Sequence, residues 1–385
     1  MVIQGARQIF SVSINFIQSL MAIKEIAGND TVLDLLESYK IQLGKYHKIV
    51  LNEGKLEGNE LITETVMQEH KQKFLKHLRD NNTDSLVEVL LSLRVNALQI
   101  APELRKNLVY ELIRNDIFTI EAENNFSVVM RILAVENNAL KHAVTSLISV
   151  IASTLKGVEY LTHGNDMTIV RSVVKILKGC ENCSVTQRFC IAILQKCSIK
   201  ETVIPTLIEH NMVFWVLDLL NESLSKKVHV FCLDFSSALL ANIMHSPHTI
   251  SFLENNMDVA RKALEAMLNL IRSSIPVSVL MHILISISYF SKDNFAKLLE
   301  ELRFVDKISK FVEKYSQINT TDNEALEIDK KTVLDLCAHM FHPKDITLDN
   351  SESENGLDLK SEDRIREYEN EQGELIFECF QDEVN

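Results

Sequence analysis

The chain has 385 residues, of which 46% are hydrophobic and 6% aromatic, and it contains only ten glycines and five prolines. So few helix breakers suit long helices with short joints, and they argue against a glycine-rich α/β enzyme, whose phosphate loops and strand-to-helix turns use glycine. The net charge of −13 is concentrated in residues 345–385, which carry 14 acidic and three basic side chains, so the near-neutral remainder lacks the basic footprint of a nucleic-acid-binding domain.

Residues 1–80 are predicted to form an N-terminal helical segment. The apolar run at 9–23 contains polar residues and is shorter than the roughly 20 residues of a membrane span, so we expect a buried helix and no membrane span. A heptad seam over 30–50 favours packing against flanking helices, with a short coiled coil as the alternative. The third helix, 60–79, has a basic second half, which indicates a solvated face or, alternatively, a contact for an acidic surface such as the chain's own tail.

Residues 84–342 are predicted to form armadillo-like helical repeats. The first helix is expected to begin with a capping box at Ser85 and Glu88. Four leucines then precede polar joints at a constant spacing of 46 residues: Leu161, Leu207, Leu253 and Leu299. The helices after the joints are expected to open at an equally regular spacing, at Met167, Met212, Met257 and Leu302. One unit of this length cannot cover its own apolar faces, so the pattern predicts an all-α, armadillo/HEAT-like α-solenoid of stacked units.

Residues 187–221 contain the clearest unit, with two helices, a polar joint and a third helix that carries an apolar stripe. The only tryptophan, Trp215, lies on this stripe and is predicted to belong to the core, with an anchor on a concave face as the alternative. Stacked third helices are expected to line a groove for extended or helical peptides. The polar groups expected to hold a peptide backbone lie in the joints: Asn165, His210, Asn255 and Asn256.

Four cysteines within 18 residues have a spacing that raises the question of a zinc site: Cys180, Cys183, Cys190 and Cys197. The last two lie about 10 Å apart along one helix, so both cannot reach one ion with the first pair, and we favour no metal. Because Cys190 and Cys197 fall on apolar helical faces, and the total of seven cysteines is odd, we expect free, buried thiols in a reducing compartment.

The remaining motifs give no catalytic chemistry. The close histidine pairs, His245 with His248 and His339 with His342, lack the glutamate of H-E-x-x-H and are interpreted as surface histidines. No P-loop, nucleophile elbow or dinucleotide fingerprint is present. We therefore predict no catalytic, cofactor-binding or metal residue and no enzyme activity; a zinc- or thiol-dependent enzyme centred on the four cysteines is the alternative from a different class.

The C-terminal end is predicted to be a helix over 331–340 followed by an acidic tail, 343–385, that is largely disordered because it has few apolar groups to bury. An apolar cluster at 375–380 is either a docking motif, a segment that folds back on the repeats, or without a role. A tail of this charge can compete for basic patches on the groove.

Several stretches resemble a known family, above all Ala192–Ser198 and the pattern Met212-x-x-Trp215-x-Leu217-x-x-Leu220, with Leu108–Asp116 and Val173–Lys178 beside them. They resemble the armadillo region of LisH-domain armadillo-repeat proteins of the ciliary basal body. The resemblance implies a non-enzymatic protein-binding scaffold without a cofactor, in cilium or basal-body assembly, maintenance or axonemal microtubule stability.

The implied partners are ciliary or microtubule-associated proteins, and the implied location is the cytoplasm and cytoskeleton, at the basal body or axoneme. We find no LisH motif in the first 30 residues, so the resemblance leaves the oligomeric state open. The alternative is a general cytoplasmic armadillo or HEAT adaptor for transport or signalling complexes, although an importin-like adaptor would need more than one tryptophan in its groove.

Overall fold

The computed structural model describes residues 64–99, 102–120, 128–164, 167–180, 184–224, 228–272, 275–291, 293–318 and 324–341. The chain divides into two compact units, residues 1–70 and 71–385, and the arrangement reported below is that of the second unit. The helices predicted within 5–50 and the acidic tail at 343–385 lie outside the described residues.

The described residues form helices joined by short turns, and no strand occurs among them. The α-helices are α3 (Glu64–Arg79), α4 (Thr83–Gln99), α5 (Pro102–Arg114), α6 (Val128–Ala134), α7 (Asn138–Ile151), α8 (Leu155–Leu161), α9 (Thr168–Gly179), α10 (Val185–Cys197), α11 (Ile204–Glu209), α12 (Met212–Glu222), α13 (Val230–His245), α14 (Pro247–Glu254), α15 (Met257–Leu270), α16 (Val277–Ser288), α17 (Ala296–Glu301), α18 (Phe304–Ser316) and α19 (Glu324–Phe341). Three short 3₁₀ helices lie between them: η2 (Glu201–Val203), η3 (Tyr289–Ser291) and η4 (Asp293–Phe295).

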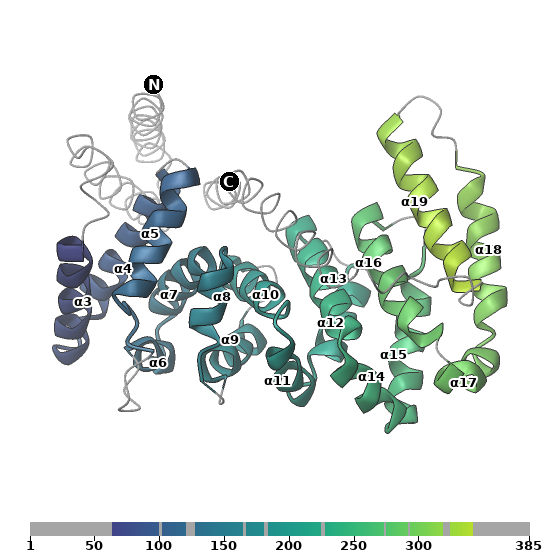
Figure 1. The fold of residues 1–385 in the computed structure, drawn as a ribbon, viewed down its shortest axis with the longest axis horizontal. Coiled ribbons are helices and arrows are strands. Elements are labelled where there is room, and N and C mark those ends of the chain that lie inside the picture. The colour runs from purple at the N-terminus through teal and green to yellow at the C-terminus, as the bar shows by residue number, and fades with distance from the viewer. Residues whose placement is uncertain are drawn as a thin grey trace, which may run out of the picture. The chain divides into compact units, whose positions relative to one another are not determined.

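Helices that are three elements apart in the chain correspond to one another and form three rows (Figure 1). Row A consists of α4, α7, α10, α13, α16 and α19, and each consecutive pair in this row packs together. Row B consists of α5, α8, α11, α14 and α17, and row C of α6, α9, α12, α15 and α18. One helix of each row makes one repeat, as in α8–α9–α10, so the prediction of an all-α solenoid of stacked three-helix units is confirmed.

Hydrogen bonds between neighbouring repeats show the same period as the sequence. Four of them join side chains 44 or 45 residues apart: Tyr160 with Asp116, Asn242 with Ser198, His282 with Ser237, and Tyr289 with His245. A constant separation of this kind means that equivalent positions of successive repeats lie against one another. The repeats are therefore held together by polar contacts as well as by their apolar faces.

The leucines that mark the repeats are buried in three of four cases. Leu161, Leu207 and Leu253 are at most 2% exposed. In the fourth repeat the buried residue is Leu298 instead, whereas the predicted Leu299 is half-buried. Two 3₁₀ helices, η3 and η4, precede α17 in this repeat, and their tighter winding changes which residue faces the core.

The helices of row C open close to the predicted residues, and left-handed residues set the exact positions. Met167, Asn211 and Arg303 have φ values of 46°, 55° and 51°, and each directly precedes a row C helix. This conformation reverses the chain between the short row B helix and the row C helix. α18 therefore begins at Phe304, two residues after the predicted Leu302.

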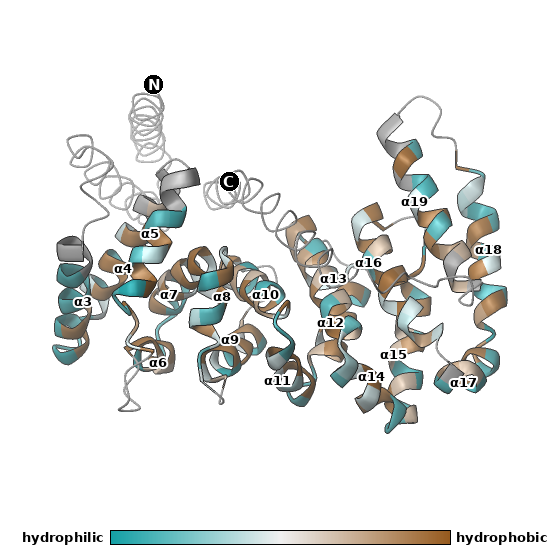
Figure 2. Cartoon of the chain, in the orientation of Figure 1, coloured by the Kyte–Doolittle hydropathy of each residue, from teal (hydrophilic) through white to brown (hydrophobic). Residues whose placement is uncertain are grey.

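Hydrophobic residues on the helices face their neighbours, and hydrophilic residues cover the outer sides (Figure 2). Within the described segments, no single helix is long and apolar enough to cross a membrane. Only the pair 201–209 and 212–222, which is bent by 73°, reaches that length and composition. Residues of this pair such as Leu207, Met212 and Val216 belong to the buried core of the repeats.

Two predicted helix ends differ from the structure. α4 begins at Thr83, and the Ser85 amide donates to Asn82 Oδ1 at 3.1 Å, so Asn82 holds the first turn in place of the expected capping box at Ser85. α19 begins at Glu324, seven residues before the predicted start. Its first turns include Ile328, which is 60% exposed, so no apolar stripe marked them in the sequence.

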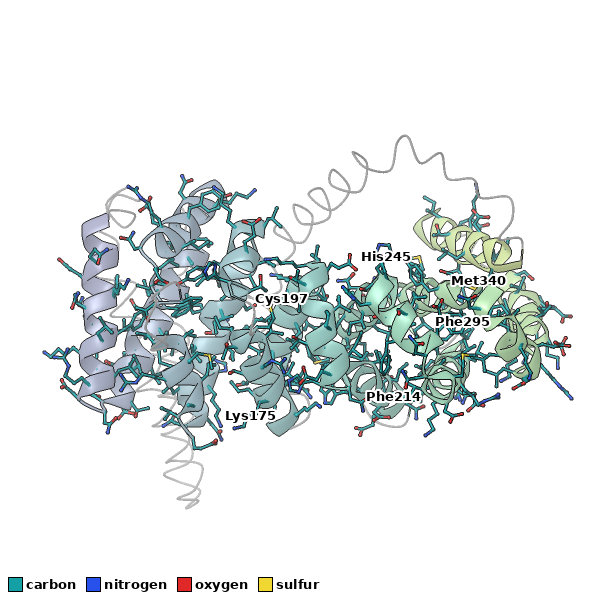
Figure 3. The ribbon with its side chains drawn as sticks, turned by 60° about the horizontal axis from the view of Figure 1, so that its bottom comes forward. Lys175, Cys197, Phe214, His245, Phe295 and Met340 are labelled. Carbon is teal, nitrogen blue, oxygen red and sulfur yellow. The ribbon has the colours of Figure 1, made fainter. Side chains whose placement is uncertain are left out.

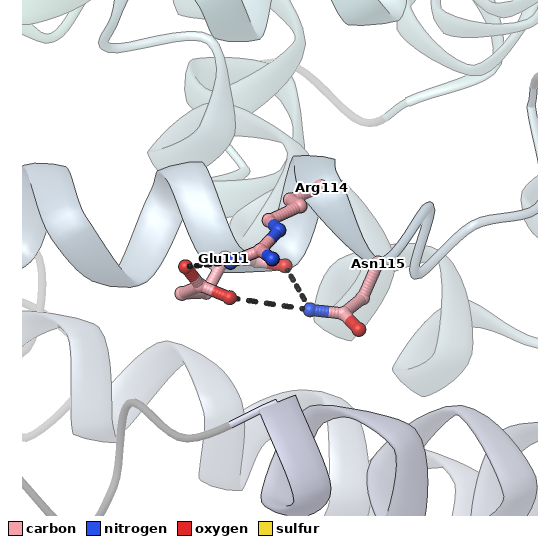
Figure 4. A network of polar contacts seen from close by, with 3 residues as sticks. All are labelled: Glu111, Arg114 and Asn115. Atoms are coloured by element: carbon pink, nitrogen blue, oxygen red, sulfur yellow. Dashed lines mark hydrogen bonds and ion pairs between the residues drawn. The ribbon is translucent and has the colours of Figure 1, made fainter.

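The C-terminal end of α5 is closed by a small polar network (Figure 4). Glu111 pairs with the exposed Arg114 at 3.4 Å, and the Asn115 amide donates to the Glu111 carbonyl oxygen at 2.9 Å. The Lys71 ammonium donates in turn to the Asn115 carbonyl oxygen at 2.9 Å. The Glu111 carbonyl oxygen also accepts from the Asn115 backbone amide at 3.0 Å, so these contacts hold Asn115 at the end of the helix.

Candidate protein-binding surface

Row A carries polar side chains that are buried although their chemistry does not belong in an apolar core. On α10 these are Gln187, Arg188, Gln195 and Lys196, which are 1%, 7%, 6% and 7% exposed. With 100° of rotation per residue, the four lie on one half of the helix circumference. We call the half that carries these four side chains the polar half of α10, although Ile191 and Ala192 also lie on it; the other half is apolar, and both halves are covered.

The packing of α10 explains part of this burial. α10 contacts α7 and α13 along row A and α9 within its own repeat. Every residue from 187 to 197 is buried, which includes the apolar core and the polar half. A helix buried all round is normally apolar all round, and α10 departs from this rule because polar side chains are buried on it as well.

Four residues at matching positions of successive row A helices form what we call the polar ladder: Arg94 on α4, His142 on α7, Arg188 on α10 and Asp234 on α13. Their spacings of 48, 46 and 46 residues are one repeat each. The ladder thus crosses four helices with one polar group on each.

The first half of the ladder is organised around Phe189. The Arg94 guanidinium, 3% exposed, lies 4.7 Å from the centroid of the Phe189 ring, and the His142 ring lies 5.5 Å from the same centroid. His142 Nδ1 is also 3.3 Å from Thr186 Oγ1. Burial, and next to it the positive charge of Arg94, lowers the pKa of His142 to about 4. The imidazole is therefore neutral at physiological pH, and the positive charge of this cluster belongs to Arg94.

Hydrogen bonds also join α13, the helix that carries the last ladder residue, to α10. Asn242 on α13 donates from Nδ2 to the Gln195 carbonyl oxygen at 3.2 Å and to Ser198 Oγ at 2.9 Å. On the same helix, Ser237 Oγ is 2.9 Å from His282 Nδ1 of α16. Among the described residues, the buried Oδ1 atom of Asp234 has no hydrogen-bond partner, which leaves it as an acceptor at the end of the ladder.

Row A and row C occupy different sides of the second unit. In Figure 3, the labelled row A residues Cys197, His245 and Met340 lie along one side, and Lys175 and Phe214 of row C lie along the other. α12, which was predicted to be a groove-lining third helix, belongs to row C. The continuous series of packed helices among the described residues is row A, which begins with α4 and α7, and the predicted groove on third helices stays a prediction.

Trp215 on α12 is half-buried, so its predicted place in the core is wrong. The apolar stripe of α12 is completed instead by Met212, Val216 and Leu219, and the indole lies at the edge of this stripe. Trp215 also lies on a row C helix, away from the polar ladder. It is therefore neither a core residue nor an anchor on row A.

The polar joint residues are engaged within the protein. Arg171 of α9 pairs with Glu209 at 2.7 Å and lies 3.3 Å from His210 Nε2, and Lys178 donates to the His210 carbonyl oxygen at 2.7 Å. Asn255 and Asn256 donate to carbonyl oxygens of α14, at 2.8 and 2.7 Å. These side chains fasten one repeat to the next or end a helix, whereas they were predicted to hold a peptide; Asn165 lies outside the described residues.

Most of the cysteines that the structure describes are buried, free thiols. Cys190 and Cys197 are fully buried, as predicted, and burial raises the pKa of both thiols, that of Cys197 to about 12. Cys180 is half-buried, and a hydrogen bond from Cys190 lowers its pKa to about 7. Cys183 lies outside the described residues, and within those that are described no three metal-ligating side chains gather at one point.

His245 and His248 are both exposed, as predicted for surface histidines. His245 is exposed, and its Nδ1 is 2.6 Å from the Tyr289 hydroxyl of the next repeat, which also stacks edge-on against it. His248 is an exposed residue of α14. His245 therefore serves the contact between α13 and α16, and the side chains of His339 and His342 lie outside what the structure describes.

The polar ladder itself was not found from the sequence. Each of its members lies within an apolar helix, and periodicity identifies apolar stripes, not isolated polar residues on them. The only signal was the spacing of one repeat between charged or polar residues in otherwise apolar helices. This spacing identifies equivalent positions only after the helices have been assigned to row A.

Comparison with known proteins supports the fold. No protein-family model matches the chain. The chain is similar to a designed armadillo repeat protein in complex with the peptide (KR)4, with a TM-score of 0.50 and 15% identity, over 70% of this chain and 99% of the other. It is equally similar, with a TM-score of 0.50 and 16% identity, to a computationally designed armadillo repeat protein for modular peptide recognition, over 68% of this chain and 98% of the other.

Two natural proteins share sequence with part of the chain. The LisH domain-containing protein ARMC9 of Rattus norvegicus is 26% identical over 141 residues, and that of Bos taurus is 25% identical over 141 residues. The match covers 37% of this chain but only 19% and 20% of these relatives. The chain therefore resembles a LisH-domain armadillo protein in one region and has the armadillo fold.

Proposed function

We propose that this protein is a non-enzymatic scaffold that binds an extended segment of another protein across the row A helices. The observation that carries the proposal is the polar ladder, with one polar or charged side chain at the same position of four successive helices. Repeats that present equivalent groups at a regular spacing suit a partner whose own backbone repeats regularly.

We place this scaffold at the ciliary basal body or axoneme, in the assembly or maintenance of cilia or the stability of axonemal microtubules. The support is the resemblance of residues 187–221 and their flanks to LisH-domain armadillo proteins, together with the sequence match to ARMC9. A general cytoplasmic adaptor of transport or signalling complexes is the second candidate, and the armadillo fold supports both equally.

The location is tested by tagging the protein in a ciliated cell beside a basal-body marker. Enrichment at basal bodies or along the axoneme is the expected result. A diffuse signal that does not change while cilia assemble would contradict the ciliary role and favour the general adaptor.

The binding surface is tested by proximity labelling with the wild-type chain and two variants. The double substitution R94Q/R188Q removes both ladder arginines and is expected to abolish labelling of the partners that the wild type labels. The matched control is K262Q on α15 of row C, which is an exposed lysine. Circular dichroism verifies that each variant is folded, and equal partner sets for all three proteins would exclude row A as the binding surface.

A further inference from the structure

α18 is the last row C helix among the described residues, and its surface differs from that of the three row C helices before it. The four helices align on buried residues that recur at spacings of four and three. These buried sets are Val170, Val174 and Leu177 on α9; Val213, Leu217 and Leu220 on α12; Ala260, Leu264 and Met267 on α15; and Phe304, Ile308 and Phe311 on α18. The alignment identifies the equivalent positions of the four helices.

The residues directly before the members of each buried set form a second line along every helix. On α9, α12 and α15 this line is entirely apolar: Ile169, Val173, Ile176, Met212, Val216, Leu219, Val259, Ala263 and Ala266. Val259 and Ala266 are half-buried and the others are buried. On α18 the same line consists of Arg303, Lys307 and Lys310, and all three are exposed. The line that is covered in three repeats is therefore positively charged and uncovered on α18.

Lys314 extends this line by one turn. The four cations then follow one another at spacings of four, three and four residues, and we call them the α18 cationic line: Arg303, Lys307, Lys310 and Lys314. The three lysines lie within an arc of about 60° and, with Arg303 one turn earlier, span about 16 Å of helix. All four side chains are exposed, and none of them forms a hydrogen bond or ion pair with a described residue.

The stability of the helix does not account for four cations of one sign. A terminal repeat needs a polar outer face, but a mixture of both signs provides one equally well. Like charges three and four residues apart repel one another on a helix. Arg303 and Lys307 also lie at the N-terminal end of α18, where the helix dipole favours anions. A row of carboxylates against the line would offset this repulsion.

The spacing of the line indicates the shape of the partner. Spacings of four, three and four residues form a heptad seam, along which a second helix stays in contact at a shallow angle of about 20°. Asp306 and Glu313 are exposed on α18 beside the line. These carboxylates, together with the net charge of −13, repel a phosphate backbone. An acidic helix of a protein is therefore favoured over a nucleic acid.

From the equivalent positions, the single sign of charge and the heptad spacing, we propose that the α18 cationic line docks an acidic helix of another protein. The docked helix carries carboxylates at spacings of four, three and four residues and lies along α18. This surface belongs to row C and shares no residue with the polar ladder of row A. The proposal therefore goes beyond the proposed function and gives the scaffold a second, separate surface for a partner.

Fluorescence anisotropy with the full-length chain and a labelled synthetic peptide tests the proposal. The probe is an alanine-rich helix of about 20 residues, long enough to be helical in water, with glutamates at the spacing of the line. A second peptide of the same composition has its glutamates spread around the helix. In low salt, where exposed ion pairs are least screened, the first peptide is expected to bind at least about tenfold more tightly than the second, because only it aligns all its carboxylates with the line.

Charge exchange identifies the binding site. K307E/K310E is expected to weaken binding of the acidic peptide about tenfold or more, because two attractions become repulsions. The matched control is K73E/K76E on α3, which makes the same change at two exposed lysines with the same spacing and is expected to leave binding unchanged. A peptide with lysines in place of the glutamates should bind K307E/K310E and not the wild type. Circular dichroism verifies that both variants are folded.

Three outcomes would overturn the proposal. Absence of binding in low salt would mean that the line only keeps the end of row C polar. Equal losses in K307E/K310E and K73E/K76E would mean that any basic surface attracts the peptide. Tighter binding of a labelled DNA duplex than of the peptide, lost in K307E/K310E, would assign the line to a nucleic acid. Each of these results concerns α18 alone, so the scaffold proposal, which R94Q/R188Q tests on row A, would stand.

Discussion

The Tyr160 hydroxyl donates a hydrogen bond to Asp116 Oδ1 at 2.7 Å and accepts one from the Phe118 amide at 3.1 Å. Tyr160 lies in row B helix α8, and Asp116, with φ of 42°, lies in the joint one repeat earlier. Asp116 Oδ1 also accepts from the Ile120 amide at 2.7 Å. A single buried hydroxyl thus fixes a left-handed turn of the preceding repeat.

Tyr160→Phe is therefore expected to lower the free energy of unfolding by about 1–2 kcal/mol, because it leaves the buried Phe118 amide without this acceptor. Urea unfolding followed by circular dichroism measures the change. The control is Tyr110→Phe, since the Tyr110 ring is 37% exposed and keeps its contact with the Lys156 ammonium. Equal losses in the two variants would contradict a specific role for the Tyr160 hydroxyl.

Gly157 lies where α8 packs tightly on the end of α7. A Cβ at this position would overlap the Ile151 carbonyl oxygen and lie 2.9 Å from Thr154 Oγ1, the N-cap of α8. Gly157→Ala is expected to destabilise the protein by more than about 2 kcal/mol, because backbone must move to accommodate the methyl group. At Gly179, the last residue of α9, a Cβ would meet nothing within 4 Å.

Gly179→Ala is the matched control and is expected to be neutral or to stabilise by about 0.5–1 kcal/mol, since alanine is the better helix former. Thermal unfolding of both variants gives the comparison. A similar change in melting temperature for the two would show that the close approach at Gly157 carries no constraint.

Cys180 is expected to be the most reactive thiol among the described cysteines. Its pKa of about 7, lowered mainly by the hydrogen bond from Cys190, makes about half of it thiolate at neutral pH. Burial raises the pKa of Cys197 to about 12 and that of Cys337 to about 11. Iodoacetamide alkylation read by mass spectrometry should modify Cys180 first, with a rate midpoint near pH 7.

Cys190→Ala removes the thiol that stabilises the Cys180 thiolate, so the midpoint of Cys180 alkylation should move to higher pH. Cys197→Ala, at a thiol two turns further along α10, should leave that midpoint in place. Alkylation of Cys180 with the same pH profile in all three proteins would exclude the contact with Cys190 as the cause.

The buried His142 makes stability depend on pH. Its pKa is about 4 in the folded chain, lowered by burial and then by Arg94, against an ordinary value of 6.5. As pH falls below 6.5, the unfolded chain takes up a proton that the folded chain rejects, so the contribution of this site to stability declines until about pH 4. The total loss over this window is roughly 3 kcal/mol.

His142→Gln cannot take up that proton, so its stability should fall less steeply than that of the wild type between pH 6.5 and pH 4. Urea midpoints measured at half-unit pH steps give the difference between the two curves, and other groups cancel in the comparison. Parallel curves would mean that His142 titrates alike in the folded and unfolded chains.

Features of the fold that depend on residues close together in the sequence were predictable, and features that depend on contacts between distant segments were not. Leu161, Leu207 and Leu253 mark buried positions because apolar periodicity within one helix is a local property of the sequence. Leu299 was off by one residue because 3₁₀ turns, which have no strong sequence signal, precede α17. Trp215 was misplaced because the stripe of α12 has a partly exposed edge, and periodicity alone cannot say where a neighbouring helix ends.

The candidate surface was less predictable, because it combines residues from four repeats. Arg94 and Phe189 are 95 positions apart, yet the guanidinium lies over the ring. The polar joint residue His210 looked available for a peptide, but Arg171 and Lys178 of the preceding repeat reach it. Such contacts depend on which helix faces which, and that is decided by packing between repeats.

The amino-acid sequence by itself determined the helical class, the period of 46 residues and the burial of three of the four repeat leucines, since these follow from the spacing of apolar side chains along one helix. Only the tertiary structure decided that α4, α7, α10 and α13 form one continuous row and that Arg94, His142, Arg188 and Asp234 align across it. The physical reason is that stacking brings equivalent positions of successive repeats together, and it decides which side of each helix lies against a neighbour.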